Sequence, residues 1–302
     1  TSDLGHDVRF ARSALEADGI LVINRIKAHT NFTGRVESGL CKMLAVGLGK
    51  QAGAQATHEC ALANGYVETI EAAIDVIRDN APVLGGIGIV ENFYDRTAHI
   101  EGISAADLPD AETPLLRKAY EYMPTLPYDE LDVLVVERIG KDISGAGMDT
   151  NVTGRYQLLN ADEPDTPDYK RIVVTGLTEA THGNGQGIGS ADLTTVDVAE
   201  QLDLDQMYTN ALTSGSLSKA RTPVVLPSEK HAVTAAVSTI GTYDPDTVRI
   251  AWIRDTAHLS SFYVSEAVAT EKHDHIEIED WVSLSFEEGA SVFESLPAHD
   301  AS

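Results

Sequence analysis

A short apolar run opens residues 19–58, which read GILVINRIKAHTNFTGRVESGLCKMLAVGLGKQAGAQATH. The run from Gly19 to Asn24 is rich in β-branched residues, which predicts a buried strand. Between Arg25 and His58 the sequence then places seven side chains of basic type and a single acid, Glu37. In a chain with 47 acidic residues against 22 lysines and arginines, this local excess predicts a binding site for an anion.

Three residues of this stretch can bind a metal or transfer a proton: His29, Lys42 and His58. Each one alone also has an ordinary structural interpretation. A histidine after a strand is usually a loop residue, and a histidine late in a helix suits the helix dipole. The lysine lies in an apolar helical run, so it either extends to water or faces a cavity. Only the combination of the three indicates chemistry.

The stretch Ile26–His58 as a whole resembles the signature of the nickel-pincer lactate racemase family. The spacing from lysine to histidine, 58 − 42 = 16 residues, matches the family pattern. Val8–Asp18 resembles the family's helix before the strand. Two details differ, because Ala28 replaces the usual proline and the interval from His29 to Lys42 is somewhat longer than in the racemases. The resemblance is closest to an uncharacterised racemase-like or epimerase-like branch, and it implies an upstream segment that this sequence lacks.

This resemblance implies an enzyme, an isomerase that racemises or epimerises a 2-hydroxy acid by hydride transfer to and from a nickel-pincer cofactor. The implied cofactor is pyridinium-3,5-bisthiocarboxylic acid mononucleotide with nickel, and the implied partners are the substrate and the cofactor-synthesis proteins. By the same resemblance, Lys42 anchors the cofactor and His58 is the nickel ligand, a role that suits imidazole. His29 takes the proton of the substrate hydroxyl. Arg35 and Lys50 are expected to help bind the cofactor.

Two other functions fit the same residues. A metal-free enzyme would use Lys42 as a nucleophile that forms a Schiff base with a carbonyl substrate. A hydroxyacid-binding module of the same fold would bind its ligand without turnover. A separate His-Asp-His run at 273–275 is typical of alternate ligands on a strand, but the sequence shows no third ligand for it.

Composition narrows the class of protein and its partners. A net charge of −25 disfavours nucleic acid and anionic membranes as partners. No run of 18 apolar residues is present, and the two cysteines, Cys41 and Cys60, form no disulfide framework, so we predict a cytoplasmic protein. The acid excess is typical of a halophilic protein, in which salt screens self-repulsion. The oligomeric state is left open.

Alternating strand and helix patterns predict an α/β fold of two domains with mixed or mostly parallel sheets. Prolines cluster between residues 109 and 127. They predict a domain boundary there. The family resemblance implies that residues 1–115 are the remainder of a cofactor-binding domain and residues 116–302 a domain that closes over the substrate, with an active-site cleft between them. Helices are expected at 7–17, 36–48, 52–64, 67–78, 115–122, 196–204, 205–212 and 229–240, and strands at 19–24, 82–91, 97–102, 132–137, 171–176, 247–253 and 275–279.

Two glycine-rich loops, 140–155 and 178–192, follow predicted strands of the second domain. Ligands of open α/β sheets bind beyond the carboxyl ends of the strands. The family resemblance implies that the first loop reaches the substrate carboxylate: Lys141 resembles a lysine of the racemases, and Arg155 replaces further binding residues, since a guanidinium forks onto a carboxylate. His182 of the second loop is a further candidate acid/base, expected to contact the substrate. The alternative is a pair of surface loops with a structural arginine.

Overall fold

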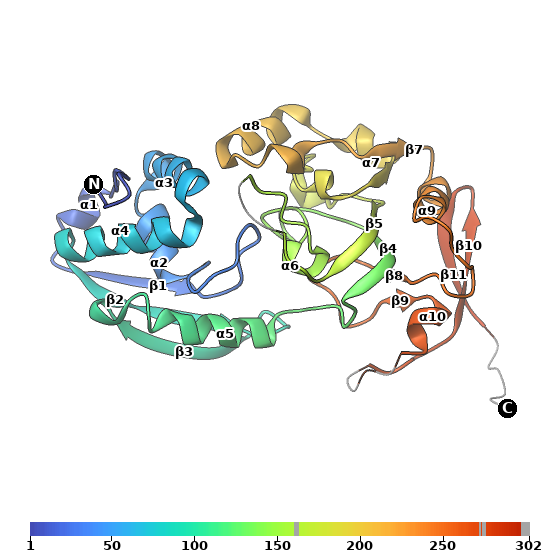
Figure 1. Ribbon diagram of the computed structural model, residues 1–302, viewed down its shortest axis with the longest axis horizontal. Coiled ribbons are helices and arrows are strands. Elements are labelled where there is room, and N and C mark those ends of the chain that lie inside the picture. Colours follow the sequence, from blue (N-terminus) through green and yellow to red (C-terminus); the bar gives the residue numbers. More distant parts are fainter. Residues whose placement is uncertain (160–162, 272, 274–275, 297–302) are drawn as a thin grey trace. The chain divides into compact units, whose positions relative to one another are not determined.

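The structure is a computed structural model of the 302-residue chain, and it describes residues 1–159, 163–271, 273 and 276–296 (Figure 1). It is an α/β fold, as the sequence predicted. Two compact units make up the described chain. One is formed mainly by Thr1–Pro124, and the other by Thr125–Gln157, Glu163–Leu212 and the described residues from Ser216 onward. Among the described helices, none has the length and apolar character that a membrane crossing requires.

A three-stranded sheet with helices packed on it forms the first unit. Its elements are α1 (Arg12–Leu15), β1 (Ile20–Arg25), α2 (Leu40–Lys42), the π-helix η1 (Met43–Gly47), α3 (Lys50–Asn64), α4 (Tyr66–Asn80), β2 (Val83–Glu91), β3 (Thr97–Ser104), the 3-10 helix η2 (Ala105–Asp107) and α5 (Glu112–Tyr122). The strand order is β1-β2-β3, with β1 parallel to β2 and β3 antiparallel to it.

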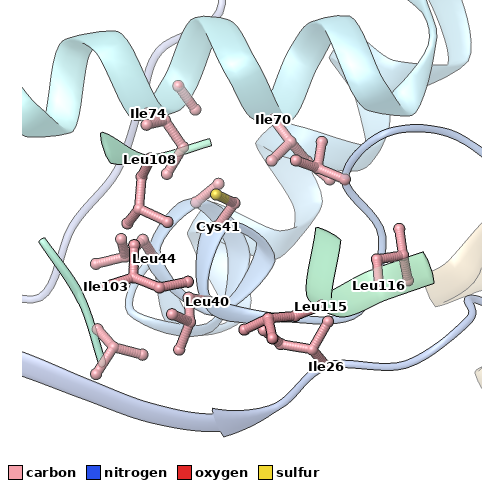
Figure 2. Close-up of a cluster of buried hydrophobic side chains, with 14 of the residues drawn as sticks. Ile26, Leu40, Cys41, Leu44, Ile70, Ile74, Ile103, Leu108, Leu115 and Leu116 are labelled. Carbon is pink, nitrogen blue, oxygen red and sulfur yellow. The ribbon is translucent and has the colours of Figure 1, made fainter. Parts of the chain in front are cut away.

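The core of this unit fixes the short helix that carries Lys42. Leu40, Cys41 and Leu44 are almost completely buried, and they pack with Ile70 and Ile74 of α4 (Figure 2). Close packing of these buried side chains leaves the helical turn little freedom to rotate. The position of Lys42 is therefore set by its apolar neighbours.

A six-stranded sheet forms the centre of the second unit. Its elements are β4 (Glu130–Val136), α6 (Thr150–Thr153), β5 (Asp168–Val174), the 3-10 helices η3 (Glu179–Thr181) and η4 (Ile188–Ser190), β6 (Leu193–Thr195), α7 (Val196–Gln201), α8 (Leu204–Ser214), the 3-10 helix η5 (Leu217–Ala220), β7 (Val224–Leu226), α9 (Glu229–Ser238), β8 (Ile250–Ile253), β9 (Tyr263–Val264), α10 (Glu266–Ala269), β10 (Val282–Glu287) and β11 (Ala290–Ser295). The order is β7-β6-β5-β4-β8-β9, and all neighbours are parallel except β8 and β9. β10 and β11 form a separate hairpin.

The helix predicted at residues 7–17 is wrong for its first half, because α1 begins only at Arg12. The Ala11 N–H instead donates to the Leu48 carbonyl at 2.8 Å. The Arg9 carbonyl approaches α3 so closely that a Cβ at Gly49 would lie 2.7 Å from it. These contacts between backbone segments override the helical pattern.

Three other predicted elements differ from the structure. The helix expected at 36–48 begins at Leu40, and the strand expected at 247–253 begins at Ile250. No strand covers 276–279, so that part of the strand predicted at 275–279 is wrong, while His275 lies outside the described residues. Five further strands were not predicted: β6, β7, β9, β10 and β11. Each is either short or partly exposed, so its residues show only a weak apolar pattern.

Candidate functional site

The structure brings His29, Lys42 and His58 into one cluster in the first unit. His29 lies in the loop between β1 and α2, Lys42 ends α2, and His58 lies in α3. Lys42 Nζ lies 2.5 Å from His29 Nε2. The Lys42 charge also contributes to lowering the pKa of His58, which places these two side chains within electrostatic range of each other. The spacing in the sequence therefore corresponds to proximity in space.

The hydrogen bonds of His29 define which of its ring nitrogens carries a proton. The Asn31 backbone N–H donates to His29 Nδ1 at 3.0 Å, so Nδ1 is an acceptor. In a neutral imidazole the other nitrogen then carries the hydrogen. Nε2–H consequently points at Lys42 Nζ, and only an uncharged amine can accept it.

Lys42 is buried enough to favour this uncharged amine. Burial, and secondly the charge of Lys27, lower the pKa of Lys42 from 10.5 to about 8. Desolvation disfavours the ammonium form because a low-dielectric interior solvates charge poorly. With a pKa near 8, Lys42 has a far larger uncharged fraction near neutral pH than an ordinary lysine, and the uncharged amine is a nucleophile.

His58 is held by a tyrosine. His58 Nδ1 lies 3.0 Å from the Tyr66 hydroxyl, and their rings meet edge to face with centroids 5.7 Å apart. Burial, and then the charge of Lys42, lower the pKa of His58. Burial raises the pKa of Tyr66, so its hydroxyl stays protonated. In the tautomer whose Nδ1–H donates to the Tyr66 oxygen, the neutral His58 ring can use Nε2 as a metal ligand.

Two aromatic rings connect the two histidines. Phe32 and Tyr66 stack with centroids 4.7 Å apart and planes 6° from parallel. The His29 ring lies 4.4 Å from the Phe32 ring and 6.5 Å from the Tyr66 ring. The stacked rings thus give one side of the cluster an apolar surface. Neither aromatic residue was predicted from the sequence, because a lone Phe or Tyr in a loop or helix carries no local signal.

Two buried carboxylates support the backbone of the site, and neither was predicted to do so. Glu37 is 0% exposed and Glu112 is 1% exposed. Glu112 Oε2 accepts the Cys41 backbone N–H at 2.9 Å, at the start of the helix that carries Lys42. Burial is the leading influence on both acids and raises the pKa of each. The available sequence signal was Glu37 itself, the only acid in a basic stretch.

Arg35 and Lys50 are placed differently from the three central residues. The Arg35 guanidinium forms ion pairs with Glu71 and with Asp110, the second at 2.7 Å, and these bonds raise its pKa. Lys50 begins α3 with an exposed side chain and a φ of 52°. Their predicted contact with a cofactor stays a prediction.

The residues expected to bind substrate in the second unit have mainly local partners. Lys141 Nζ donates to the Gly145 carbonyl at 2.7 Å, and burial lowers the pKa of this lysine. His182 is exposed in the left-handed region, with φ 48°. Arg155 donates to the backbone carbonyls of Ser190 and Tyr169, at 2.8 Å each. The Arg155 guanidinium also forms an ion pair with Asp192, close to η4. The Arg155 guanidinium thus joins two backbone segments. This is the behaviour of a structural arginine, which was the alternative to substrate binding.

Lys219 is a second buried lysine that the sequence analysis missed. It is 1% exposed in η5. Burial lowers its pKa to about 8, against the opposing charges of Glu163 and Asp149. Its surroundings in the sequence, SLSKAR, resemble any polar surface segment, so no local pattern indicates its burial.

The part of the chain that the structure describes holds no group of three or more histidine, cysteine or acidic side chains arranged for a metal. A metal bound by one imidazole and by donors of a cofactor does not require such a group. Of the His-Asp-His run, Asp274 and His275 lie outside the described residues.

Comparison with protein families and with curated proteins identifies no relative of this chain. No protein-family model matches the chain, and a search of curated proteins gives no match either. The chemistry of the site must therefore be inferred from His29, Lys42 and His58 and from the resemblance of the stretch that contains them.

Proposed function

We propose that His29, Lys42 and His58 form the active site of a 2-hydroxyacid racemase or epimerase that uses a nickel-pincer cofactor. One observation carries the proposal: the imidazole of His29 contacts a partly buried lysine amine, within electrostatic range of a second neutral imidazole. The family signature names the same three positions. The acid-rich composition supports a cytoplasmic protein that works at high salt.

The residues fit the chemistry of the implied cofactor. Covalent anchoring needs an uncharged amine, and burial favours that form of Lys42. Nickel suits imidazole, and Tyr66 engages Nδ1 of His58, so Nε2 would be the ligand atom. When bound, the cofactor supplies a reversible acceptor for the hydride at C2 of the substrate. Proteins that synthesise the cofactor are then required partners.

The role of His29 in this scheme is to move the proton of the substrate's 2-hydroxyl group. Asn31 occupies Nδ1, so the exchangeable proton is at Nε2. A cofactor held by Lys42 through an amide-type bond would leave the Lys42 nitrogen non-basic, so that it would no longer compete for Nε2 of His29. To act as a base, the neutral His29 ring must carry its hydrogen on Nδ1, which gives up the Asn31 N–H contact and leaves Nε2 unprotonated. Nε2 then takes the hydroxyl proton as the ketone forms and returns it as the alcohol is restored.

The test is the interconversion of the two enantiomers of 2-hydroxy acids that carry deuterium at C2. Protein made together with the cofactor-synthesis proteins should convert one enantiomer to the other with deuterium retained at C2, because hydride leaves and returns. His29→Ala should lower the rate by about 10²- to 10⁴-fold, the usual effect of losing a general base. Interconversion with loss of deuterium to solvent would contradict the proposal.

The lowered pKa of Lys42 also favours a second candidate, a Schiff-base enzyme without metal. Its amine would condense with a substrate carbonyl to form an imine and release water. Borohydride would reduce that imine to a stable secondary amine on Lys42. Trapping of a keto acid on Lys42 in metal-free protein, with no interconversion of hydroxy acids by protein made with the cofactor-synthesis proteins, would favour this candidate.

A further inference from the structure

The loop that carries His29 is closed around a buried carboxylate. At its base, the Lys27 backbone N–H donates to the Ser38 carbonyl at 2.9 Å. Inside the loop, Glu37 Oε2 accepts the His29 backbone N–H at 2.6 Å, and Oε1 accepts the Gly34 N–H at 2.9 Å. The two oxygens of one side chain thus bind the two halves of the loop.

A third donor completes the surroundings of this carboxylate. The Tyr120 hydroxyl of α5 lies 2.9 Å from Glu37 Oε1 and 3.1 Å from Oε2. Glu37 has no exposed surface. A buried carboxylate is costly unless its oxygens are hydrogen-bonded. Here two backbone N–H groups and one hydroxyl group provide those bonds, so the loop and the acid stabilise each other.

We infer that Glu37 is the positioning residue of this site: its carboxylate holds the loop so that the His29 ring stays against the Lys42 amine. The hydrogen bond from the His29 N–H to Glu37 fixes the backbone nitrogen, which is bonded to the Cα atom that carries the imidazole side chain. The ring is then confined between the Asn31 N–H at Nδ1 and the lysine at Nε2. The role of His29 in chemistry rests on the proposed function, whereas the contact with Lys42 does not.

Two variants separate this positioning role from a simple effect of charge. Glu37→Gln keeps the reach of the side chain but replaces one acceptor by an NH₂ group, which faces a backbone N–H. Glu37→Asp keeps the charge but withdraws the carboxylate by one methylene group. If the loop moves, water reaches the Lys42 amine and the pKa of this lysine rises toward 10.5, since burial is the leading cause of its lowering. If only charge matters, Glu37→Gln lowers the pKa of Lys42 and Glu37→Asp leaves it unchanged.

The experiment measures acetylation of the Lys42 amine in cofactor-free protein by the N-hydroxysuccinimide ester of acetic acid, over a range of pH. Peptide mass spectrometry reads the modification, with exposed Lys230 as the internal reference. Wild type should show a midpoint near pH 8. Both variants should shift the midpoint upward. A shift of one pKa unit lowers the neutral fraction at pH 8 from about one half to about one tenth, so the rate at pH 8 should fall by about fivefold or more. Tyr120→Phe keeps both backbone contacts and should leave the midpoint unchanged.

Unchanged or lowered midpoints in both Glu37 variants would overturn the assignment, and so would an equal upward shift in Tyr120→Phe. If the variants do not fold, hydrogen exchange of the wild-type protein decides. The N–H groups of His29 and Gly34 should then exchange far more slowly than in an unstructured peptide, and unprotected exchange at both would overturn the assignment. No cofactor or substrate enters these measurements, so failure of the proposed racemase activity would be seen separately.

Discussion

At the scale of single residues, burial of Lys42 makes the stability of the protein depend on alkaline pH. The folded chain releases the Lys42 proton near pH 8 and the unfolded chain near 10.5. Between these values unfolding takes up a proton, so the free energy of unfolding rises with pH. Lys42→Met should reduce that rise, as measured by denaturant unfolding followed by circular dichroism. Lys219, also lowered to about 8, accounts for a remaining slope. Equal slopes in wild type and Lys42→Met would contradict the burial of this amine.

Tyr66 provides a second prediction at this scale. Its hydroxyl holds His58 Nδ1 at 3.0 Å and so directs Nε2 toward a metal. Partners of this kind typically contribute about 10- to 100-fold to metal affinity. Tyr66→Phe should therefore weaken nickel retention by that amount and leave covalent attachment at Lys42 intact. Tyr122→Phe, which changes an exposed tyrosine, is the matched control. Equal nickel content in the two variants after dialysis against a chelator would show that Tyr66 has no such role.

The sequence indicated which residues gather at the site but not how they are held. His29, Lys42 and His58 follow one strand within a short stretch, so local spacing was enough to associate them. The bond from Tyr120 to Glu37 joins residues 83 positions apart, and such a partner depends on the tertiary fold. The protonated nitrogen of His29 follows from the Asn31 N–H, which only the backbone geometry reveals.

At the scale of elements, the start of α2 depends on close approach of a glycine to a carboxylate. Gly39 has an extended backbone that any residue could adopt, but a Cβ there would overlap Glu112 Oε1. Gly39→Ala should displace that carboxylate from the Cys41 N–H and lower the free energy of unfolding by about 1–3 kcal/mol, as overpacking does. Gly102→Ala on β3 meets open space and is the control. Urea unfolding that gives equal stabilities for the two variants would contradict this view of the helix start.

The helices and strands themselves followed the sequence where an apolar pattern was strong. The regular spacing of Ile70, Ile74 and Ile77 predicted α4 well, and these residues are buried in it. The segment before Arg12 failed because its backbone is used for tertiary contacts with Leu48 and Gly49. A residue pattern predicts which face is apolar, but it does not show whether a neighbouring backbone competes for the same N–H groups.

At the scale of the whole molecule, charge is the dominant property. A net charge of −25 destabilises a compact state through self-repulsion, and salt screens that repulsion. The melting temperature should therefore rise as salt increases from low to molar concentration. Calorimetric scans in potassium chloride measure this directly, with sucrose at equal osmolality as the control for general solute effects. A melting temperature that stays constant or falls with salt would contradict the halophilic interpretation.

The α/β architecture was predictable because strands and helices alternate along both halves of the chain, and β4 and β5 each end in an apolar run, residues 133–136 and 172–174. The strand order β7-β6-β5-β4-β8-β9 was not predictable. β6 and β7 have only three residues each, which is too few to show a strand pattern in the sequence. Substrate roles for Lys141, Arg155 and His182 stay predictions.

The most direct test of the central claim is the intact mass and metal content of the protein made together with the cofactor-synthesis proteins. The proposed site predicts a covalent adduct on Lys42, located by peptide mass spectrometry, and about one nickel per chain, as expected for coordination by a single imidazole. Lys42→Ala should carry no adduct, and His58→Ala should keep the adduct but lose nickel. Wild-type protein without an adduct, or the same adduct mass on Lys42→Ala, would contradict the claim that this cluster is a nickel-pincer site.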